Sequence, residues 1–284
     1  VDRDGSVYVA GYSDATWQGD NNTDPLHPHS GGVDIMVLKV NSQGAYQWHT
    51  FYGSSSDDFA RGIAVDGSGY VYVTGHSKAT WDTPLNAYNA KADMVVLKLD
   101  SNGNYKWHTF YGSAGEDVAY GITVVGNGSV YVTGYSDATW GTPLNAHSGG
   151  EDIVVLKLTA GGTYQWHTFY GSSSWDAGRG IAADGNTHIY VVGQSKAAWG
   201  SPKNAYSGAG DIVVLKLDSD GSRQWHTFYG STAEDNGHAI AVADDGSVCV
   251  TGSSQATWGT PLHAHAGGNK NDVAVLKLDR NGTR

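Results

Sequence analysis

Several features common in other protein classes are scarce in this chain. Only one cysteine is present, so no internal disulfide can form. Charged residues make up 16% of the chain, against a typical value of about 25%, and no helical period of 3.6 residues persists for more than a turn. Helix-rich and coiled-coil folds are therefore excluded. No apolar stretch approaches the roughly 18 residues that cross a bilayer, so we expect no membrane insertion.

Basic residues are also few and scattered. Seventeen Lys and Arg stand against 28 Asp and Glu, which gives a formal net charge of −11 without any basic run. The phosphate-neutralising surface that nucleic acid requires is missing, and anionic membranes are equally poor partners. The chain has no signal peptide and starts at Val1 rather than Met, so we expect it to be cut from a longer precursor.

What the chain has in excess is glycine, aromatic residues and internal repetition. It contains 40 Gly, 10 Trp and 17 Tyr in 284 residues, a composition typical of β-structure. The Trp of Trp-His-Thr recurs at 48, 107, 166 and 225, a spacing of 59 residues. Regular repetition of this length indicates an array of similar structural units. We expect one domain over 1–284 with repeat units at approximately 1–61, 62–120, 121–179, 180–238 and 239–284.

Each unit contains four short strand signals separated by turn residues. They are illustrated by 180–184, 130–136, 152–158 and 164–170. The third is continuously apolar, which predicts that both of its faces are covered, and the mixed faces of the fourth suit an outer strand. Asn-Gly and Asp-Gly turns join these strands. The pattern predicts an all-β fold, a β-propeller with five blades of four antiparallel strands whose terminal blades are incomplete.

The single cysteine falls on one of these strands. Cys249 occupies the position at which the other units have Tyr8, Tyr72, Tyr131 and Tyr190. We therefore expect it to be a buried substitution rather than a reactive thiol.

The repeated motifs also carry a family resemblance. The runs Gly-Gly-Glu-Asp-Ile-Val-Val-Leu-Lys-Leu, Trp-His-Thr-Phe-Tyr-Gly, Gly-Ile-Ala-Val-Asp and Val-Tyr-Val-Thr-Gly resemble the SBBP type of β-propeller repeat of bacterial extracellular proteins. The strand order is similar to that of NHL-like propellers, in which the Gly-Ile-Ala-Val-Asp strand is innermost. The resemblance implies a propeller and an extracellular or cell-surface location. It implies no shared activity.

The repeat arithmetic leaves one gap. Five full units would need a further stretch equivalent to 224–241, which holds one outer strand and most of one inner strand. Three arrangements remain open: a five-bladed ring with trimmed ends, a fragment of a larger ring, or a sheet completed by a partner strand or by flanking repeats.

The longest connection of each unit, between the second and third strands, carries the candidate ligand-binding residues. A Trp recurs there in every unit, followed by Pro, then Asn or His, then His or Tyr. An aromatic platform with amide and imidazole groups can grip a sugar, and five such sites would bind a multivalent glycan. The alternative is that the Trp plugs the gap between neighbouring blades while Pro stiffens the loop. The candidate residues are Trp17, Trp81, Trp140, Trp199, Trp258, Asn86, Asn145, Asn204, His29, Tyr88, His147, Tyr206 and His265.

A second group of residues precedes the first strand of each unit. It includes adjacent acids such as Asp57 and Asp58, and carboxylates in a loop can hold Ca²⁺. One or two carboxylates supply few ligands, and we expect instead that the Asp caps backbone amides or pairs with the third-strand Lys, such as Lys157. No metal site is assigned on this basis and no cofactor is expected. The calcium candidates are Asp58, Asp117, Asp176 and Asp235.

The remaining repeated polar residues favour architecture over catalysis. His49, His108, His167 and His226 recur once per unit on the presumed outer strand, where a shared metal ion is out of reach. An enzyme needs an asymmetric set of nucleophile, base and stabiliser, and no such set stands out. We expect a non-catalytic scaffold or protein-interaction module of a larger extracellular protein, or alternatively a lectin-like propeller with one glycan site per blade.

Overall fold

The computed structural model describes residues 1–185, 187–268 and 270–284. Across these residues the chain forms β-strands, with one short 3₁₀ helix, η1 (Asp20–Asn22), in the insertion of the first unit. The strands are β1 (Val7–Ser13), β2 (Asp34–Val40), β3 (Tyr46–Tyr52), β4 (Asp58–Val65), β5 (Val71–Ser77), β6 (Asp93–Leu99), β7 (Tyr105–Tyr111), β8 (Asp117–Val124), β9 (Val130–Ser136), β10 (Asp152–Leu158), β11 (Tyr164–Tyr170), β12 (Asp176–Ala183), β13 (His188–Ser195), β14 (Asp211–Asp218), β15 (Arg223–Tyr229), β16 (Asp235–Val242), β17 (Val248–Ser254) and β18 (Asp272–Leu278). Within the described ranges, no helix is long and apolar enough to cross a membrane.

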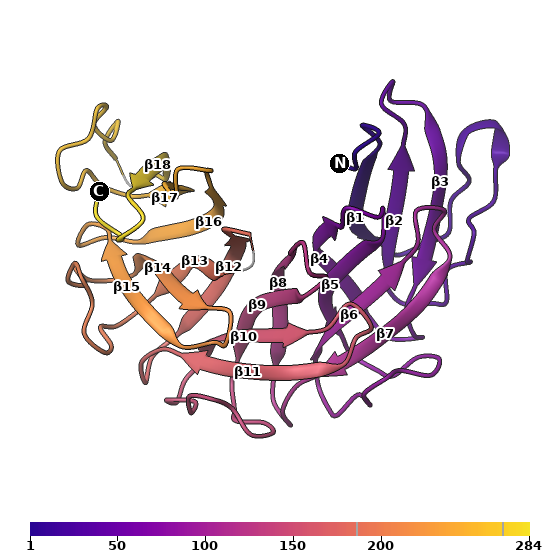
Figure 1. The fold of residues 1–284 in the computed structure, drawn as a ribbon, viewed down its shortest axis with the longest axis horizontal. Coiled ribbons are helices and arrows are strands. Elements are labelled where there is room, and N and C mark those ends of the chain that lie inside the picture. Colours follow the sequence, from indigo (N-terminus) through magenta and orange to yellow (C-terminus); the bar gives the residue numbers. More distant parts are fainter. Residues whose placement is uncertain (186, 269) are drawn as a thin grey trace. The chain divides into compact units, whose positions relative to one another are not determined.

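The strands form five antiparallel sheets, each made of strands that follow one another along the chain. The sheets are β1-β2-β3, β4-β5-β6-β7, β8-β9-β10-β11, β12-β13-β14-β15 and β16-β17-β18. Figure 1 shows β4, β5, β6 and β7 side by side in this order. Sheets of three or four strands repeated in this way are the blades of a β-propeller, which confirms the predicted fold class. The two terminal sheets have three strands, as the repeat arithmetic predicted.

Most of the predicted strand ranges agree with the structure. The ranges 130–136, 152–158 and 164–170 coincide with β9, β10 and β11. The first strand was placed too late, because β12 starts at Asp176 rather than at 180. A β-bulge between Gly178 and Gly180 lets the strand continue through a glycine-rich segment that looked like its end in the sequence.

The third strand of the middle blades is covered on both faces, as its continuous apolar run predicted. Every residue of β6 is buried, and so is every residue of β14 except the last. The fourth strand lies at the sheet edge, next to the third. The order of strands in each sheet therefore follows from the apolar pattern of each segment.

The described residues divide into two compact units, Val1–Val132 with Lys157–Gln165 and Thr133–Leu156 with Trp166–Arg284. In the first unit the first strands of consecutive sheets adjoin, β1 beside β4 and β4 beside β8. Its core includes Val37, Val73, Leu97 and Phe110. In the second unit β12 adjoins β16, and the core includes Val192, Val214, Tyr229 and Val250. The Gly-Ile strands β4 and β8 thus adjoin in the first unit, and β12 adjoins its Ala-Ile counterpart β16 in the second, as expected for inner strands.

The Asn-Gly turn after β6 contacts the preceding sheet. Gly103 closes this turn with a φ of 83°, a backbone conformation that glycine adopts without strain. An added Cβ at Gly103 would lie 2.5 Å from Leu26 Cδ1 and 3.1 Å from the Trp48 ring. Leu26 belongs to the β1–β2 loop and Trp48 to β3, so the turn of the second sheet is seated on the first. Glycine is required there both by φ and by the close approach.

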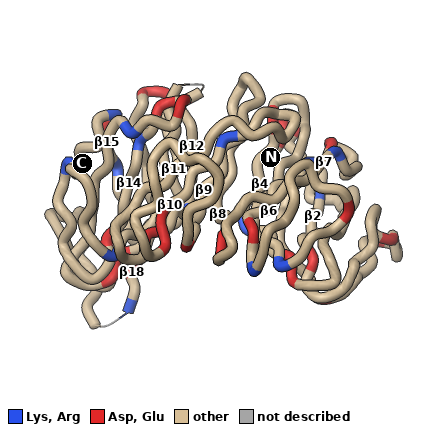
Figure 2. The backbone as a smooth tube through the Cα atoms, turned by 90° about the horizontal axis from the view of Figure 1, so that it is seen from below, with Lys and Arg blue, Asp and Glu red and all other residues tan. Residues whose placement is uncertain are grey.

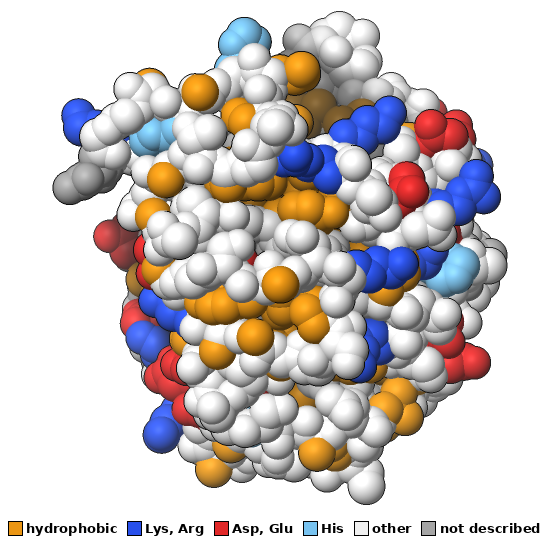
Figure 3. All heavy atoms as spheres, turned by 90° about the vertical axis from the view of Figure 1, so that its left-hand side faces the viewer, with side chains coloured by type: hydrophobic (Ala, Val, Ile, Leu, Met, Phe, Trp, Pro, Cys, Tyr) orange, Lys and Arg blue, Asp and Glu red, His pale blue; other side chains and the backbone are white. Residues whose placement is uncertain are grey.

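Cys249 is exposed, and the expectation that it is buried was wrong. It lies on β17 opposite Lys277 of β18, on a face where Val273 and Val275 are also 84% and 75% exposed. Its counterparts Tyr72 and Tyr190 are fully buried. Figure 3 views the side on which β16, β17 and β18 lie and shows hydrophobic side chains gathered on it. The sequence position alone did not reveal that this face is uncovered.

The seating of the turn gives a direct test of the contact between the first two sheets. Gly103→Ala should lower the free energy of unfolding by about 2–4 kcal/mol, because a strained φ and steric overlap act together. Gly44→Ala is the matched control, since Gly44 has a φ of 80° but nothing within 4 Å of its added Cβ. That variant should lose only about 1 kcal/mol. Equal losses in urea-unfolding experiments would contradict the contact.

Candidate functional site

The loop between the second and third strands runs along the outer strand of its own blade. In the second blade the Leu85 amide donates to the His108 carbonyl (2.9 Å), and the Phe110 amide donates to the Asn86 carbonyl (3.2 Å). The Asn86 side-chain amide donates to the Phe110 carbonyl at 2.7 Å. The same side-chain contact is made by Asn145 to Phe169 and by Asn204 to Phe228, each at 2.6 Å. The loop therefore satisfies backbone groups at the edge of the sheet.

Each loop tryptophan of the first four blades stacks on the histidine of the outer strand. Ring centroids are 3.8 Å apart for Trp17 and His49, and 3.6 Å for Trp81 and His108. The corresponding distances are 3.6 Å for Trp140 and His167, and 3.9 Å for Trp199 and His226. All four interplanar angles are 9° or less. The recurring histidines predicted to be structural thus have a defined partner.

The histidine also fixes the tryptophan through the backbone. His108 Nε2 donates to the Trp81 carbonyl at 3.0 Å, and Tyr105 Oη donates to His108 Nδ1 at 2.9 Å. Burial lowers the pKa of His108, His167 and His226 to about 4. These imidazoles are neutral at pH 7, which agrees with His108 donating from one ring nitrogen and accepting at the other.

The opposite side of the tryptophan faces the preceding blade. Trp81 lies 6.2 Å from the Tyr52 ring of β3, and Trp199 lies 6.2 Å from the Tyr170 ring of β11. Trp81 and Trp199 are only 6% and 8% exposed, whereas Trp17, Trp140 and Trp258 are half-buried. Trp258 packs on Tyr229 (6.1 Å) and donates Nε1–H to Ser254 Oγ. The rings of Trp81, Trp199 and Trp258 thus lie between neighbouring blades.

The other predicted ligand-binding groups also contact the protein itself. Tyr88 Oη lies 2.9 Å from the Lys78 carbonyl and 3.0 Å from the Lys91 carbonyl. His29 and His147 each donate Nε2–H to a serine carbonyl at 3.2 Å, that of Ser13 and Ser136. Tyr206 packs edge-on against Phe228 at 5.7 Å, and His265 Nε2 bonds to the Lys270 carbonyl at 2.9 Å.

Two of the predicted residues line one pocket. Asn145 from one blade and Trp199 from the next meet there with Tyr170, Gly171, Gly200 and Arg223. The guanidinium of Arg223 lies 5.8 Å from the Trp199 ring and 6.0 Å from the Tyr170 ring. The structure therefore brings together an amide, an indole and a cation from neighbouring blades.

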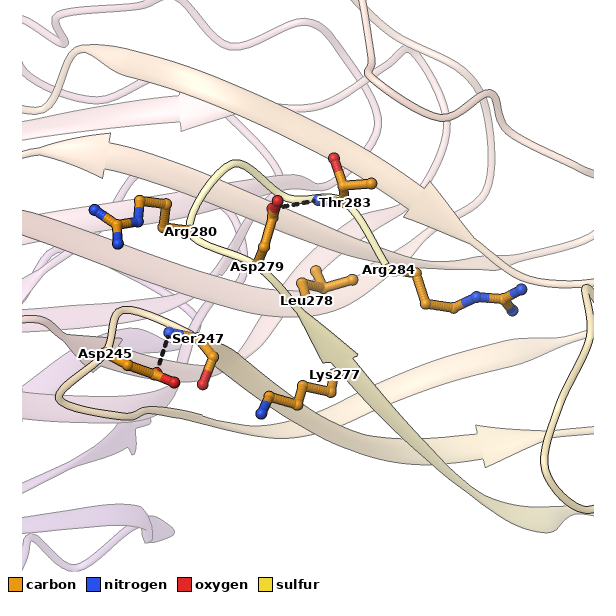
Figure 4. Close-up of a pocket in the computed structure, with 8 residues that line it drawn as sticks. All are labelled: Asp245, Ser247, Lys277, Leu278, Asp279, Arg280, Thr283 and Arg284. Carbon is orange, nitrogen blue, oxygen red and sulfur yellow. Dashed lines mark hydrogen bonds between the residues drawn. The ribbon is translucent and has the colours of Figure 1, made fainter.

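A second hollow lies over the C-terminal sheet. It is lined by Asp245, Ser247, Lys277, Leu278, Asp279, Arg280, Thr283 and Arg284. Figure 4 shows the Arg280 and Arg284 side chains pointing to opposite sides. The carboxylates of Asp245 and Asp279 accept hydrogen bonds from the backbone amides of Ser247 (2.8 Å) and Thr283 (2.9 Å). The two arginine side chains point apart, and the two carboxylates are bonded to the backbone of their own turns. The charged groups of this hollow therefore do not point to a common ligand position.

Basic groups are scattered in the folded chain as in the sequence. Figure 2 shows Lys and Arg distributed singly along the backbone in that view.

Lys98 Nζ donates to the Ala160 carbonyl (2.9 Å) and lies 4.8 Å from the centre of the Tyr72 ring. Lys39 makes the corresponding contacts with the Ser101 carbonyl (3.1 Å) and the Tyr8 ring (5.0 Å). The expected pairing of third-strand lysines with the acids before the inner strand is therefore wrong for these two, because a turn carbonyl and a tyrosine ring lie closer.

The acids before the first strand are buried and cap backbone amides, as expected. Asp58 Oδ2 accepts from the amide (2.6 Å) and hydroxyl (2.8 Å) of Ser54, and Ser77 Oγ donates to Asp58 Oδ1. Asp176 and Asp235 make the same contacts with Ser172 and Ser231. The neighbouring Asp57 instead bonds to Lys78 at the surface (3.0 Å). Adjacent acids in the sequence thus point to different environments.

The acid that lies beside Asp58 is Asp34, at the start of β2. The two carboxylates flank Gly53, whose ideal Cβ would lie 2.6 Å from Asp34 Oδ1 and 2.8 Å from Asp58 Oδ2. Asp93 and Asp117 flank Gly112 in the same way. All four side chains are completely buried. The prediction missed Asp34, Asp93, Asp152 and Asp211, although each precedes its partner by a constant 24 positions.

Burial changes the protonation of these carboxyls. It raises the pKa of Asp93 and Asp211 to about 6, with a further upward contribution from the partner carboxylate. Burial likewise raises the pKa of Asp58 and Asp152 to about 6, although hydrogen-bond donors partly offset it. The buried pairs therefore hold protons more tightly than free aspartic acid does.

Comparison with known proteins supports the fold. The profile of the SBBP family, a beta-propeller repeat, matches residues 47–80, which run from β3 through β4 and β5. Residues 47–80 thus match one SBBP β-propeller repeat. An uncharacterized WD repeat-containing protein of Acanthamoeba polyphaga mimivirus is 26% identical over 171 residues, covering 50% of this chain and 12% of the relative. Regulatory protein FlaEY of Caulobacter vibrioides is 27% identical over 286 residues, covering 86% and 28%. The SBBP-repeat chain thus spans a small part of either relative.

Solved structures resemble the SBBP-repeat chain only distantly. A Bacteroides caccae protein of unknown function has a TM-score of 0.46 at 11% identity, covering 96% of this chain and 73% of the other. An ulvan lyase has a TM-score of 0.47 at 12% identity, covering 99% and 68%. NanB sialidase from Streptococcus pneumoniae has a TM-score of 0.45 at 12% identity, covering 88% and 36%. Values this low say nothing about the activity of this chain.

The raised pKa of the buried carboxyls predicts a pH effect on stability. A carboxyl with a higher pKa in the folded state contributes fully below its unfolded value of 3.8, and that contribution is lost as the pH rises towards 6. Buried histidines act in the opposite direction over the same range, so a variant must be compared with the parent. Relative to the parent, Asp93→Asn should gain about 1–3 kcal/mol of stability between pH 4 and pH 7 without divalent cations.

The control is Asp14→Asn, which removes an exposed carboxyl. Its urea-unfolding free energy should follow that of the parent across the same pH range. If the Asp93→Asn profile also ran parallel to the parent, the raised pKa of the buried carboxyl would be refuted.

Proposed function

We propose that this chain is a non-catalytic β-propeller scaffold or interaction module of a larger extracellular or cell-surface protein. One observation carries the proposal: the aromatic, amide and imidazole groups that recur in the blade loops bind the protein's own strands. Trp81 stacks on His108, and Asn86 bonds to the Phe110 carbonyl. Residues that make such contacts stabilise the blade, and their binding groups are already used within the protein.

A sugar platform would need a free aromatic face and free polar groups beside it. One face of Trp140 is covered by His167, and the Asn145 amide nitrogen is bonded to the Phe169 carbonyl. His147 Nε2 is bonded to the Ser136 carbonyl. The repeated loop therefore has fewer aromatic faces and polar groups available to a glycan than its composition indicates.

The repetition of these roles also supports a non-catalytic function. A reaction centre needs a nucleophile, a base and a stabiliser in an asymmetric arrangement. Here the same Trp, His and Asn contacts recur in successive blades. Residues with one structural role in every blade are suited to holding a repeat array together.

The extracellular or surface location rests on the resemblance of the repeat to those of bacterial extracellular proteins. It is tested by labelling intact and lysed cells of the source organism with an antibody against this chain. Labelling only after lysis would exclude the location and leave the scaffold proposal to the experiments below.

A second candidate function is favoured by the pocket that Asn145, Tyr170, Trp199 and Arg223 share. An indole, an amide and a guanidinium from adjacent blades are suited to an acidic or hydroxyl-rich sugar. The guanidinium lines this pocket and lies over the Tyr170 and Trp199 rings, where it would supply a positive charge to a ligand. This candidate predicts a single glycan site rather than one per blade.

The scaffold proposal predicts that Trp140→Ala affects stability and not ligand binding. Loss of the indole should lower the free energy of unfolding by about 2–4 kcal/mol, because a large aromatic contact is removed. The intact chain should bind nothing on a glycan array or in follow-up calorimetry. Trp175→Ala, a half-buried tryptophan outside these loops, is the control and should lose less stability.

Glycan binding that disappears in Trp140→Ala while the melting temperature is unchanged would overturn the scaffold proposal. The pocket candidate has its own variant, Arg223→Ala, which removes the cation and its contact with the Trp199 ring but leaves the stacking of Trp140 on His167 in place. Glycan binding lost in Arg223→Ala alone would establish the second candidate in place of the first.

A further inference from the structure

Buried carboxylates from two consecutive sheets meet at each of four positions along the chain. The first carboxylate stands at the start of β2, β6, β10 or β14, and the second starts the first strand of the next sheet. The pairs are Asp34 with Asp58, Asp93 with Asp117, Asp152 with Asp176, and Asp211 with Asp235. All eight side chains have no exposed surface. Figure 1 shows that the strands of one pair, β2 and β4, belong to different sheets.

The first carboxylate of each pair has one oxygen without a hydrogen-bond partner among the described residues. Its Oδ2 is satisfied, as when Asp34 Oδ2 accepts from the Ser30 amide at 2.6 Å. Its Oδ1 is completely buried and accepts no hydrogen bond. The four oxygens are Oδ1 of Asp34, Asp93, Asp152 and Asp211. A fully buried acceptor without a donor is unfavourable, and here the same defect occurs four times.

The unpartnered oxygen and one oxygen of the second carboxylate lie beside the same glycine. Asp34 Oδ1 and Asp58 Oδ2 are among the three nearest atoms to the ideal Cβ of Gly53, at 2.6 and 2.8 Å. At the next junction Asp93 Oδ1 and Asp117 Oδ2 approach Gly112 at 2.5 and 2.9 Å. A side chain on the glycine would overlap with both oxygens, so glycine is needed where the two carboxylates approach.

No lysine or arginine neutralises these charges in the described parts of the chain. The five ion pairs found there all involve other carboxylates. Buried charges of one sign need a counter-charge, a proton or a metal ion. Since the same arrangement recurs at four junctions, the missing positive charge is a property of the repeat.

We propose that each carboxylate pair binds one divalent cation, calcium, and so links two consecutive sheets. The donors are all oxygen: Oδ1 of the first Asp, Oδ2 of the second, and the serine hydroxyl next to the latter. Ser54 Oγ lies 2.8 Å from Asp58 Oδ2, and Ser231 Oγ lies 2.8 Å from Asp235 Oδ2. Oxygen-only donors with carboxylates are the ligands that calcium prefers.

The identity of the donors also excludes softer metals. Histidine and cysteine, which zinc and other transition metals favour, do not join the pairs, and among the described residues no three His, Cys, Asp or Glu side chains converge. Two carboxylates balance the charge of one divalent ion. The sequence assigned no metal site and offered only Asp58, Asp117, Asp176 and Asp235 as calcium candidates; Asp34, Asp93, Asp152 and Asp211 supply the second carboxylate that those candidates lacked.

The experiment uses the whole chain after removal of bound metal with EDTA. Calorimetric titration with CaCl₂ at pH 7.5 should give about four sites per chain, and millimolar calcium should raise the melting temperature by several degrees. Terbium provides a second readout, because Trp199 Nε1 donates to Ser195 Oγ, which donates to Asp176. Terbium bound at this junction should show luminescence excited through tryptophan.

Variants assign the sites. Asp93→Asn and Asp211→Asn each remove one carboxylate of a different pair and should each lower the stoichiometry by about one. Asp57→Asn is the control, because this acid neighbours Asp58 in sequence but faces Lys78 at the surface. It should leave the stoichiometry unchanged. Two variants in different units keep the test informative if one of them fails to fold.

Absence of calcium binding, of a melting shift and of terbium luminescence at pH 7.5 would overturn the proposal and leave a shared proton as the neutralising species. A stoichiometry that is lowered by Asp57→Asn and not by Asp93→Asn or Asp211→Asn would overturn it as well. Neither outcome depends on the scaffold or glycan functions.

Discussion

The structure depends on hydrogen bonds from the strands of one sheet to a turn of the next sheet. Lys39 Nζ of β2 and Trp48 Nε1 of β3, both in the first sheet, donate to the Ser101 carbonyl in the turn of the second sheet. Lys98 and Trp107 repeat these contacts with the Ala160 carbonyl. A sheet of three or four strands cannot bury its apolar faces alone, so it is stable only when its neighbour covers one of them. The hydrogen bonds to the turn carbonyl fix the position of the next sheet relative to the first.

The outer edge of each blade presents a second constraint, because an unpaired strand edge invites association with other strands. Here the loop between the second and third strands lies along that edge and bonds to it through Leu85 and Asn86 in the second blade. In the second and fourth blades the loop tryptophan lies between the outer-strand histidine and a tyrosine of the preceding blade. The residues with the chemistry of a binding site thus protect an edge and fill a gap, which explains why they recur in every unit.

Much of the fold was predictable because it is encoded locally. The spacing of 59 residues, the continuous apolar run at 152–158 and the glycine turns gave the number of blades and most strand limits. What the sequence did not reveal was contact between distant residues. Nothing local joins Asp34 to Asp58 or Trp81 to His108, since each pair belongs to different segments of the chain. A regular spacing was present in both cases, but spacing alone does not say which strands become neighbours.

Burial was the other property that depended on context. Cys249 occupies a tyrosine position of the repeat yet is exposed, because the face of its sheet is uncovered. The strand β12 begins four residues early because a bulge carries it past two glycines. In each case the local sequence did not reveal the property, because the exposure of Cys249 and the start of β12 depend on contacts with other strands.

The claim that recurring loop residues hold the blades together is tested most directly by a double-mutant cycle. Trp81→Ala, His108→Ala and the double variant are compared with the parent chain by equilibrium unfolding in urea. A stacked pair predicts a coupling free energy of about 0.5–1.5 kcal/mol between the two positions. Losses that simply add would contradict the account, because the two side chains would then stabilise the blade independently.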